Sequence, residues 1–528
     1  MQTATPTGVD HQVAIVGTGF GGMGAAIQLK RMGIDDFVML ERDDDLGGTW
    51  HANRYPGVAV DIASPTYSYS FEPNPNWSRL FAPGNELKDY AVQVADTYDL
   101  RRHMRFHTTA TSTYWDDDGQ FWTVEIADGD PITCRQLVLA TGILSQLHWP
   151  DIPGLDDFEG RILHTAAWNT EADLTGERVA LIGTGATGVQ VLPAIAADVE
   201  HVTVYQRTPI WVTMKPDLAV HPVVRRLFKH VPLTQKAARV ANAAFIETIG
   251  LALMLNKELP FLVDGLELLH KANLFVQVRD PELRRKLTPD YDFWCKRPTF
   301  SNDYFKAYTR DNVSLVSAPI QQVTANGIVT EDGVEQPIDT LILATGFTVQ
   351  DRGAFPPFPV HGRDGLDMGA WYQRNGYESY QGITVHGFPN LFYLSAPFAF
   401  TGLSFFYMIE SQMEHMKRLI DRMSASGATV FEVKREAQTR FVELMDERAT
   451  HTVWHNGSCG TAHSYYFNEH GQTRLGRLEP TLVARWRDRH FPFSDYRFEA
   501  PRHATVHAGR ETLVEIEPSG RDGSLSIG

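Results

Sequence analysis

The sequence contains few cysteines for its length. Cys134, Cys295 and Cys459 are the three in 528 residues. They lie far apart and form no C-x-x-C pair, so we expect no disulfide framework, no dithiol redox motif and no cysteine-based zinc site. The histidines also lack metal-ligand spacing, and we predict no metal site. We interpret four histidines as ordinary residues without a metal-binding role: His51, His103, His107 and His463.

The chain also lacks a long apolar run and an excess of basic residues. The most apolar segment, residues 241–255, is interrupted by Asn242, Glu247 and Thr248, and an uninterrupted run of about 18 apolar residues would be needed for a spanning helix. Residues 1–11 lack the basic flank and apolar stretch of a secretory signal. The formal charge of -16 argues against a general nucleic-acid binder. We therefore expect a cytoplasmic protein with no integral membrane segment and no nucleic-acid partner.

The length and composition indicate a large globular protein. A chain of 528 residues exceeds what one hydrophobic core usually fills, so two or more domains are expected. Hydrophobic residues make up 43% and charged residues 21% of the chain, which is ordinary for folded proteins and excludes general disorder.

Two parts of the chain repeat one pattern. An apolar segment at 13–16 (VAIV) leads into GTGFGG at 17–22, and one at 179–182 (VALI) leads into GTGATG at 183–188. Each is followed by residues with helical spacing, which is the context of a dinucleotide-binding turn. A second echo pairs LVLATG at 137–142 with LILATG at 341–346. The candidate phosphate-binding residues are Gly17, Gly19 and Gly22 in the first copy and Gly183, Thr184, Gly185, Thr187 and Gly188 in the second.

The residue that ends the second strand of each copy predicts the nucleotide. Residues 37–40 lead into Glu41, whose carboxylate suits the hydroxyls of an unphosphorylated ribose. Residues 202–205 lead instead into Gln206, Arg207 and Thr208, and a guanidinium beside a hydroxyl suits a 2′-phosphate. The first site should therefore hold FAD or NAD, and the second NADP.

A long segment with helical periodicity, residues 215–288, follows the second nucleotide motif. The simpler interpretation is a helical insertion that caps the nucleotide domain. A weak peripheral contact with an anionic membrane is the alternative, because basic amphipathic helices lie on such surfaces. The basic residues of its first part are Arg225, Arg226, Lys229, Lys236 and Arg239.

Two further stretches resemble one family. GGTWHANRYPGVAVD at 47–61 resembles the flavin-side motif of the type I Baeyer–Villiger monooxygenases, and FEGRILHTAAWN at 158–169 is similar to that family's FxGxxxHxxxW signature. Two departures occur: Asn169 stands where the family has Pro or Asp, and Tyr465 where many members have Trp. The resemblance extends over essentially the whole chain, including GFPNLF at 387–392.

The resemblance implies an oxidoreductase that binds FAD and NADP(H). Such an enzyme inserts one oxygen atom of O₂ next to the carbonyl of a ketone, through a C4a-peroxyflavin, and releases an ester or lactone. Because no side chain activates O₂, the flavin performs that chemistry. The aromatic residues and prolines of 355–407 suggest a small apolar ketone as substrate.

The resemblance also assigns residues to roles. Arg297 stands where the family places the cation that stabilises negative charge on the former carbonyl oxygen, and Asp61 matches the carboxylate that orients it. Lys296 matches a residue beside the NADP ribose phosphate, and Trp50 should pack against the flavin. We interpret His164 as a hinge residue rather than an acid or base. The family motifs add Gly48, Thr49, Tyr67 and Tyr465 to the cofactor-binding residues.

The predicted fold class is α/β, with two Rossmann-like dinucleotide-binding domains (FAD and NADP) and a helical insertion in the NADP domain. The expected limits are 1–150 and 346–528 for the FAD domain with a C-terminal arm, 151–215 and 291–345 for the NADP domain, and 216–290 for the insertion. Rival functions are a flavin monooxygenase that oxidises sulfur or nitrogen, and an NADP-binding flavoprotein without turnover. The missing C-x-x-C pair disfavours a flavin disulfide reductase. The oligomeric state stays open.

Overall fold

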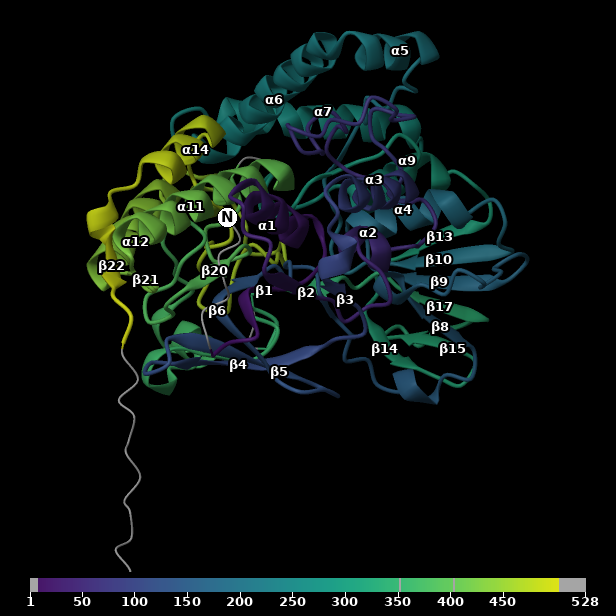
Figure 1. Cartoon of the computed structure of the whole chain (residues 1–528). Coiled ribbons are helices and arrows are strands. Elements are labelled where there is room, and N and C mark those ends of the chain that lie inside the picture. Colours follow the sequence, from purple (N-terminus) through teal and green to yellow (C-terminus); the bar gives the residue numbers. More distant parts are fainter. Residues whose placement is uncertain (1–7, 351–352, 402–403, 503–528) are drawn as a thin grey trace, which may run out of the picture.

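Two mostly parallel sheets form the framework of the chain (Figure 1). The computed structural model describes residues 8–350, 353–401 and 404–502. The larger sheet has the strand order β19-β4-β5-β6-β1-β2-β3, with β20 also paired to β6, and the smaller has the order β13-β10-β9-β17-β8. Helices pack on these sheets, so each is an α/β unit. We refer to them as the first unit and the second unit.

The first unit takes its strands from both ends of the chain. The central strand β1 is completely apolar in its last four residues, as expected for a strand covered on both faces. Helix α1 follows it directly, and α11 packs against α1. The strands are β1 (His11–Val16), β2 (Phe37–Leu40), β3 (Met104–Arg105), β4 (Ala110–Asp116), β5 (Phe121–Ile126), β6 (Ile132–Leu139), β19 (Val360–His361) and β20 (Leu391–Tyr393). The helices are α1 (Phe20–Arg31), α2 (Thr49–Ala52), α3 (Gly84–Thr97), α10 (Met368–Asn375), α11 (Phe405–Ser426) and α12 (Arg435–Ala449).

The second unit repeats the strand, turn and helix arrangement of the first. Its strand β9 lies between β10 and β17, and all of its strand pairs are parallel. The strands are β8 (Arg161–His164), β9 (Arg178–Ile182), β10 (His201–Tyr205), β13 (Val313–Val316) and β17 (Thr340–Leu343). A small antiparallel sheet of β14 (Ile320–Val323), β15 (Gly327–Thr330) and β16 (Glu335–Pro337) adjoins them, and α4 (Ala186–Ile195) and α9 (Tyr304–Ala307) pack together.

The chain passes between the two units twice, and the two crossings are paired with each other. Strand β7 (Gln146–Leu147) leaves the first unit and β18 (Phe347–Thr348) returns to it, and the two pair antiparallel. Thr345 Oγ1 donates to the carbonyl of His148 at 2.6 Å, and His164 Nε2 lies 3.4 Å from the same hydroxyl. His164 therefore lies at the junction of the two units. Burial lowers its pKa, which favours a neutral ring in a hydrogen-bonding role.

Four helices form the insertion of the second unit, and α5, α6 and α7 of these lie in the upper part of Figure 1. They are α5 (Pro222–His230), α6 (Pro232–Met254), α7 (Phe261–Gln277) and α8 (Pro281–Leu287). Three begin with proline, which suits the first helical turn because its missing N–H has no partner there. Among the described residues, α6 is the one helix long and apolar enough by length and composition to cross a membrane, with 22% of that window buried. The sequence analysis had expected no spanning helix.

The last described part of the chain folds back on the first unit. Strand β22 (Tyr496–Glu499) pairs antiparallel with β21 (Val430–Val433), and α14 (Thr481–His490) packs on α11. The sequence after Phe498 shows no strong periodicity and predicts a C-terminal arm along the surface. Its first residue, Glu499, lies in β22 instead, and residues 503–528 lie outside the described residues. The remaining elements are β11 (Val212–Thr213), β12 (Thr299–Phe300) and α13 (Val453–Asn456). The predicted fold class is confirmed; the domain limits stay a prediction.

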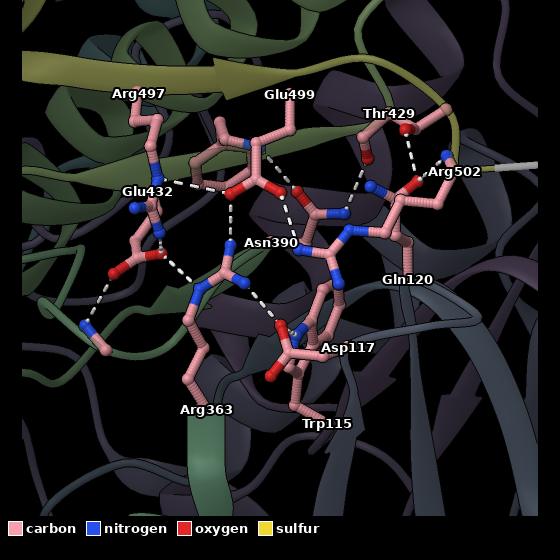
Figure 2. Close-up of polar contacts among 12 residues, drawn as sticks. Trp115, Asp117, Gln120, Arg363, Asn390, Thr429, Glu432, Arg497, Glu499 and Arg502 are labelled. Carbon is pink, nitrogen blue, oxygen red and sulfur yellow. Dashed lines mark hydrogen bonds and ion pairs between the residues drawn. The ribbon is translucent and has the colours of Figure 1, made fainter.

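A buried ionic cluster ties β22 to distant segments of the first unit (Figure 2). The guanidinium of Arg363 donates to Glu432 at 2.6 Å and also to Asp117 and Glu499. Its side chain is 16% exposed and that of Glu432 is 3% exposed. The cluster therefore joins four segments that are far apart in sequence, and charged groups removed from water in this way depend on one another.

We expect Arg363→Ala to lower the free energy of unfolding by about 3 kcal/mol, because it removes the cation that Asp117, Glu432 and Glu499 share. Among the described residues, the buried Glu432 would then keep only the half-exposed Arg497 as an arginine partner. Urea unfolding followed by tryptophan fluorescence would measure this loss. Arg502→Ala is the matched control, since Arg502 contacts the same Glu499 from a side chain that is 44% exposed. The control should change the value by about 0.5 kcal/mol or less. Equal losses in the two variants would contradict the importance of the buried cluster.

Candidate active site

Each GxGxxG turn packs against the LATG motif at the end of a neighbouring strand. Gly17 has φ +107°, and a Cβ there would lie 2.5 Å from the carbonyl oxygen of Ala140. Gly183 has φ +108°, and its Cβ would lie 2.5 Å from the carbonyl oxygen of Ala344. The two repeated motifs, GxGxxG and LATG, therefore pack against each other in both units.

The third glycine of each turn allows the helix to start close to the strand. A Cβ on Gly22 would lie 2.0 Å from the carbonyl oxygen of Gly17, and one on Gly188 would lie 2.2 Å from that of Gly183. Helices α1 and α4 begin immediately after Gly19 and Gly185. At neither N-cap does a side chain accept a hydrogen bond from the backbone N–H groups of the first turn. Their first N–H groups are thus available to a pyrophosphate.

The strand ends differ between the units as the sequence predicted. Glu41 is buried, and its carboxylate accepts from the backbone N–H and hydroxyl of Thr18 at 2.9 and 2.7 Å. In the second unit the corresponding contact is neutral: Thr184 Oγ1 donates to the carbonyl of Thr208 at 2.8 Å. The first unit therefore presents a fixed carboxylate at the edge of its turn, and the second leaves space for an anion.

Positive groups gather beside the second turn. Burial, reinforced by the nearby guanidinium of Arg207, lowers the pKa of Lys296 to about 8. His463 belongs to the same group, because burial and then Arg207 and Lys296 lower its pKa, while Asp290 opposes them. Among the described residues, Lys296 and Arg207 have no carboxylate within ion-pair distance. Unneutralised cations brought together in this way are typical of a phosphate site.

A second cation is held by a carboxylate from the other unit. Arg297 donates through Nε and Nη2 to Asp61 Oδ2, at 2.9 and 2.7 Å. The carboxylate of Asp61 raises the pKa of Arg297 well above its usual value, so the guanidinium stays charged. The side chain is 34% exposed. Burial raises the pKa of Tyr465, and a hydrogen bond with Arg297 is among the effects that oppose this rise. Tyr465 and Tyr466 lie close enough to interact with it electrostatically.

The aromatic residues of the first motif form a wall near this pair. Trp50 Nε1 donates to Tyr67 Oη at 3.3 Å, and the two rings meet edge to face at 5.7 Å. Burial raises the pKa of Tyr67, so its hydroxyl is protonated. Gly48, with φ +53°, brings the turn before Trp50 against Gly19, where a Cβ would lie 3.1 Å from the Gly19 Cα.

The same motif also contacts the second unit. Tyr55 Oη donates to Gln190 Oε1 at 2.9 Å, and Gln190 Nε2 donates to the carbonyl of Ala59 at 3.0 Å. Gly57 leaves room for helix α4, because a Cβ there would lie 2.5 Å from the Gln190 carbonyl oxygen. The motif at 47–61 is thus both a wall of the site and a contact between the units. The signature Trp168, in contrast, lies in the core of the second unit.

A disulfide that the sequence analysis did not predict joins two segments of the site. Cys295 and Cys459 are 164 residues apart but their Cα atoms lie 5.0 Å apart and their sulfurs are bonded. The bond fixes the segment with Lys296 and Arg297 to the loop that leads to His463 and Tyr465. The sequence predicts no disulfide framework, and the large separation of these two cysteines gave no sign that they would form this single bond. Cys134 is free and buried.

Almost all predicted site residues meet in one cavity of about 1630 Å³. A single small ligand usually occupies about 300–1,000 Å³, so this cavity has room for more than one. Gly22 and Gly188 lie beneath the turns instead. Buried hydroxyls of Thr141, Ser145 and Tyr205 line the cavity without a hydrogen-bond partner among the described residues, which fits a polar cofactor. The predicted residues that line it are Gly17, Gly19, Glu41, Gly48, Thr49, Trp50, Asp61, Tyr67, Gly183, Thr184, Gly185, Thr187, Arg207, Thr208, Lys296, Arg297 and Tyr465.

Comparison with known proteins agrees with this arrangement. Residues 14–251 match the family model described as pyridine nucleotide-disulphide oxidoreductase. A relative from Pseudomonas aeruginosa, named Baeyer-Villiger monooxygenase, is 40% identical over 460 residues, which is 86% of this chain and 86% of the relative. The chain belongs to the Baeyer–Villiger monooxygenase family. It is therefore a FAD-containing, NADPH-dependent monooxygenase, as the motifs predicted.

Solved structures of this family share the fold of most of this chain. The closed crystal structure of cyclohexanone monooxygenase matches with a TM-score of 0.83 and 30% identity, covering 93% of this chain and 99% of that one. OTEMO, crystallised in complex with FAD and NADP, matches with a TM-score of 0.82 and 28% identity, covering 93% of this chain and all of that one. The fold of this chain is thus the fold of solved members of the family.

Proposed function

We propose that this Baeyer–Villiger monooxygenase inserts oxygen next to the carbonyl of a small apolar ketone, with Arg297 and Asp61 as its catalytic pair. The observation that carries the proposal is the 2.7 Å contact between these residues at the cavity wall. Each comes from a different unit, so the pair forms only when the two units are correctly apposed. FAD, when bound, supplies the activation of O₂ that no side chain can provide.

Arg297 would stabilise the negative charge that develops on the former carbonyl oxygen. A guanidinium is charged at any working pH, and Asp61 fixes its plane from the side away from Nη1. A cation held in place before the reaction needs no reorganisation when charge develops, and this electrostatic effect is commonly the largest in such catalysis. Asp61 is therefore proposed to position Arg297 and to keep it charged.

The remaining residues would hold the two cofactors. In the first unit, Gly17, Gly19 and the start of α1 would bind the FAD pyrophosphate, and Glu41 its adenosine ribose. Trp50 and Tyr67, together with Gly48 and Thr49, would flank the flavin. In the second unit, Gly183 to Gly188 would bind the NADP pyrophosphate, while Arg207, Thr208 and Lys296 would bind the 2′-phosphate. His463 joins that group, although the sequence analysis had interpreted it as an ordinary residue.

The cavity wall supports an apolar substrate. Leu253 and Met254 of α6 line the cavity together with Phe400, Phe405 and Trp454. Product analysis by mass spectrometry, across cyclic, aryl and steroid ketones with NADPH, tests the proposal. We expect an ester or lactone one oxygen atom heavier than the ketone. Oxidation of sulfides or amines, with every ketone left unchanged, would contradict it.

We expect NADPH binding to weaken as the pH rises above 8. Burial and the nearby Arg207 lower the pKa of Lys296 to about 8, so above that pH it loses the charge that would bind the phosphate. The dissociation constant of NADPH should therefore increase by about fivefold between pH 8 and pH 9, while that of NADH should stay nearly constant. The concentration dependence of FAD reduction by each coenzyme, followed at each pH by anaerobic stopped-flow absorbance, would give both constants.

Lys296→Arg is the control for this titration, because its guanidinium stays protonated. The variant should bind NADPH with little pH dependence over the same interval. If NADPH binding by Lys296→Arg weakened with pH as much as binding by the wild type, a group other than Lys296 would be titrating.

The cytoplasmic location stays a proposal, and the disulfide bears on it. A reducing compartment keeps most protein thiols reduced, so a cytoplasmic enzyme should be isolated with Cys295 and Cys459 largely alkylatable. Rapid alkylation of cells followed by peptide mass spectrometry would show whether they are.

A further inference from the structure

Helix α6 has one face fixed to the protein. Gln235 Nε2 donates to the carbonyl of Asn74 at 2.7 Å, and Arg239 Nη1 donates to the carbonyls of Pro65 and Ser68 at 2.8 Å. Asn242 accepts from the hydroxyl of Thr66 at 2.8 Å. These residues are spaced along one stripe of the helix. Although α6 passes the length test for a membrane span, these bonds to the first unit hold it along the surface of the protein.

The opposite face of α6 is apolar and exposed, and α5 and α7 also carry exposed apolar side chains. Leu233 is 74% exposed and Val240 is 68% exposed. Soluble monomers seldom expose so many large apolar side chains in one area. We define the outer face of the insertion as the exposed apolar residues of the α5 to α7 segment. They are Val223, Val224, Leu227, Val231, Leu233, Val240, Phe245, Phe261, Leu268, Leu269, Phe275 and Val276.

The charged side chains on α5 and at the start of α6 are all basic. Arg225, Arg226 and Lys229 lie on α5 and Lys236 on α6, and the sequence has no Asp or Glu between Asp217 and Glu247. The whole chain carries a formal charge of -16, so this stretch is an exception. Every residue of α5 is at least partly exposed. Helix α7 adds apolar side chains, with Asp264 and Lys271 also exposed.

Basic residues beside exposed apolar ones suit a negatively charged apolar surface. A second copy of the chain, packed symmetrically on the same face, would bring the basic residues of two α5 helices together, which costs free energy. An anionic bilayer instead offers phosphate groups to the basic residues and an acyl boundary to the apolar ones. We propose that the outer face of the insertion binds the surface of anionic lipid bilayers, with α5 and α6 lying in the plane of the interface.

The position of α6 connects this surface to the cavity. Gly250, Leu253 and Met254, at the end of the same helix, line the cavity. An apolar ketone dissolved in the bilayer could therefore reach the site along α6 without crossing open water. This last point rests on the proposed function, whereas bilayer binding itself does not.

Flotation of the full-length FAD-loaded protein with lipid vesicles tests the proposal. The vesicles are phosphatidylcholine with about one-third phosphatidylglycerol, and pure phosphatidylcholine for comparison. We expect binding to the anionic vesicles that decreases at high salt. Arg225→Gln combined with Arg226→Gln, Lys229→Gln and Lys236→Gln should weaken that binding by about 100-fold. No ketone or NADPH is present, so the result is independent of the proposed reaction.

A matched charge control uses exposed basic residues elsewhere. Lys306→Gln, Arg310→Gln, Lys417→Gln and Lys434→Gln remove the same charge and should change vesicle binding by about threefold or less. Binding of the wild type that is absent, or equal in the two quadruple variants, would overturn the proposal.

A second pair of variants tests the apolar contribution. Leu233→Ser combined with Phe245→Ser and Phe275→Ser should reduce vesicle binding at least tenfold, while Val334→Ser, at an exposed apolar residue of the second unit, should not. NADPH oxidation with a water-soluble ketone should stay unchanged in all of them, which shows that they fold. A wild-type dimer that dissociates in the triple variant, without vesicle binding in either, would assign the face to a second copy and overturn the proposal.

Discussion

Arg297→Ala should lower the rate of ester formation by about 100-fold or more, while NADPH oxidation remains measurable. The variant removes the cation that would stabilise charge on the former carbonyl oxygen, and losing one such donor commonly costs about 10²–10³ in rate. It also leaves Asp61 at the cavity without its counter-charge. Reduction of the bound FAD by NADPH does not create charge on the substrate and should be less affected. Product formation by gas chromatography and NADPH consumption by absorbance would separate the two effects.

Arg297→Lys is the matched variant for this experiment. A lysine keeps the charge but lacks the planar fork that contacts Asp61 through two nitrogens. We expect its ester formation to lie between that of the wild type and Arg297→Ala. If Arg297→Ala formed ester at the wild-type rate, the proposed catalytic pair would be wrong. A loss of FAD from the variant, visible as lost yellow colour, would instead indicate a structural defect.

Arg207→Ala should weaken NADPH binding by about 100-fold and NADH binding by about threefold or less. Only NADPH carries the 2′-phosphate, and a guanidinium binds such a group through two charge-assisted hydrogen bonds. The exposed Arg207 lies beside Lys296 and His463, which share the predicted phosphate site. The concentration dependence of FAD reduction, followed by stopped-flow absorbance under anaerobic conditions, would give both affinities.

Arg310→Ala is the control for Arg207→Ala, because Arg310 is also an exposed arginine of the second unit but lies outside the residues that line the cavity. It should change neither affinity by more than about twofold. Equal losses of NADPH and NADH in Arg207→Ala would mean that the arginine binds a part shared by both coenzymes, and that the 2′-phosphate is bound elsewhere.

The parts of the fold that depend on local sequence were predictable. Gly17 and Gly183 adopt backbone angles that suit glycine alone, so the turns were visible as motifs. Apolar strands before these turns and Glu41 or Arg207 after the next strands follow at fixed distances. The periodicity of residues 215–288 likewise predicted helices. In each case the residues that determine the local structure lie within one short segment of the chain.

Features that join distant segments were not predictable without the family resemblance. Cys295 and Cys459 are ordinary isolated cysteines in the sequence, and only the fold brings them together. His463 was interpreted as an ordinary residue because its neighbours Arg207 and Lys296 lie far away along the chain. The Arg363 cluster draws its three carboxylates from three separate segments. Such contacts depend on topology, which the periodicity of single elements does not specify.

Because β7 pairs with β18, the second unit could be separated from the first by protein engineering. Because these two short strands lie side by side, the chain leaves the first unit and re-enters it at neighbouring points. Domains whose ends lie close together can be cut out or transplanted with little disturbance to their host. A two-residue hairpin from Leu147 to Phe347 would close the first unit into a continuous flavin-binding protein. The coenzyme unit of a relative could be grafted at the same two positions, provided that it supplies a cation in place of Arg297 to complete the pair with Asp61.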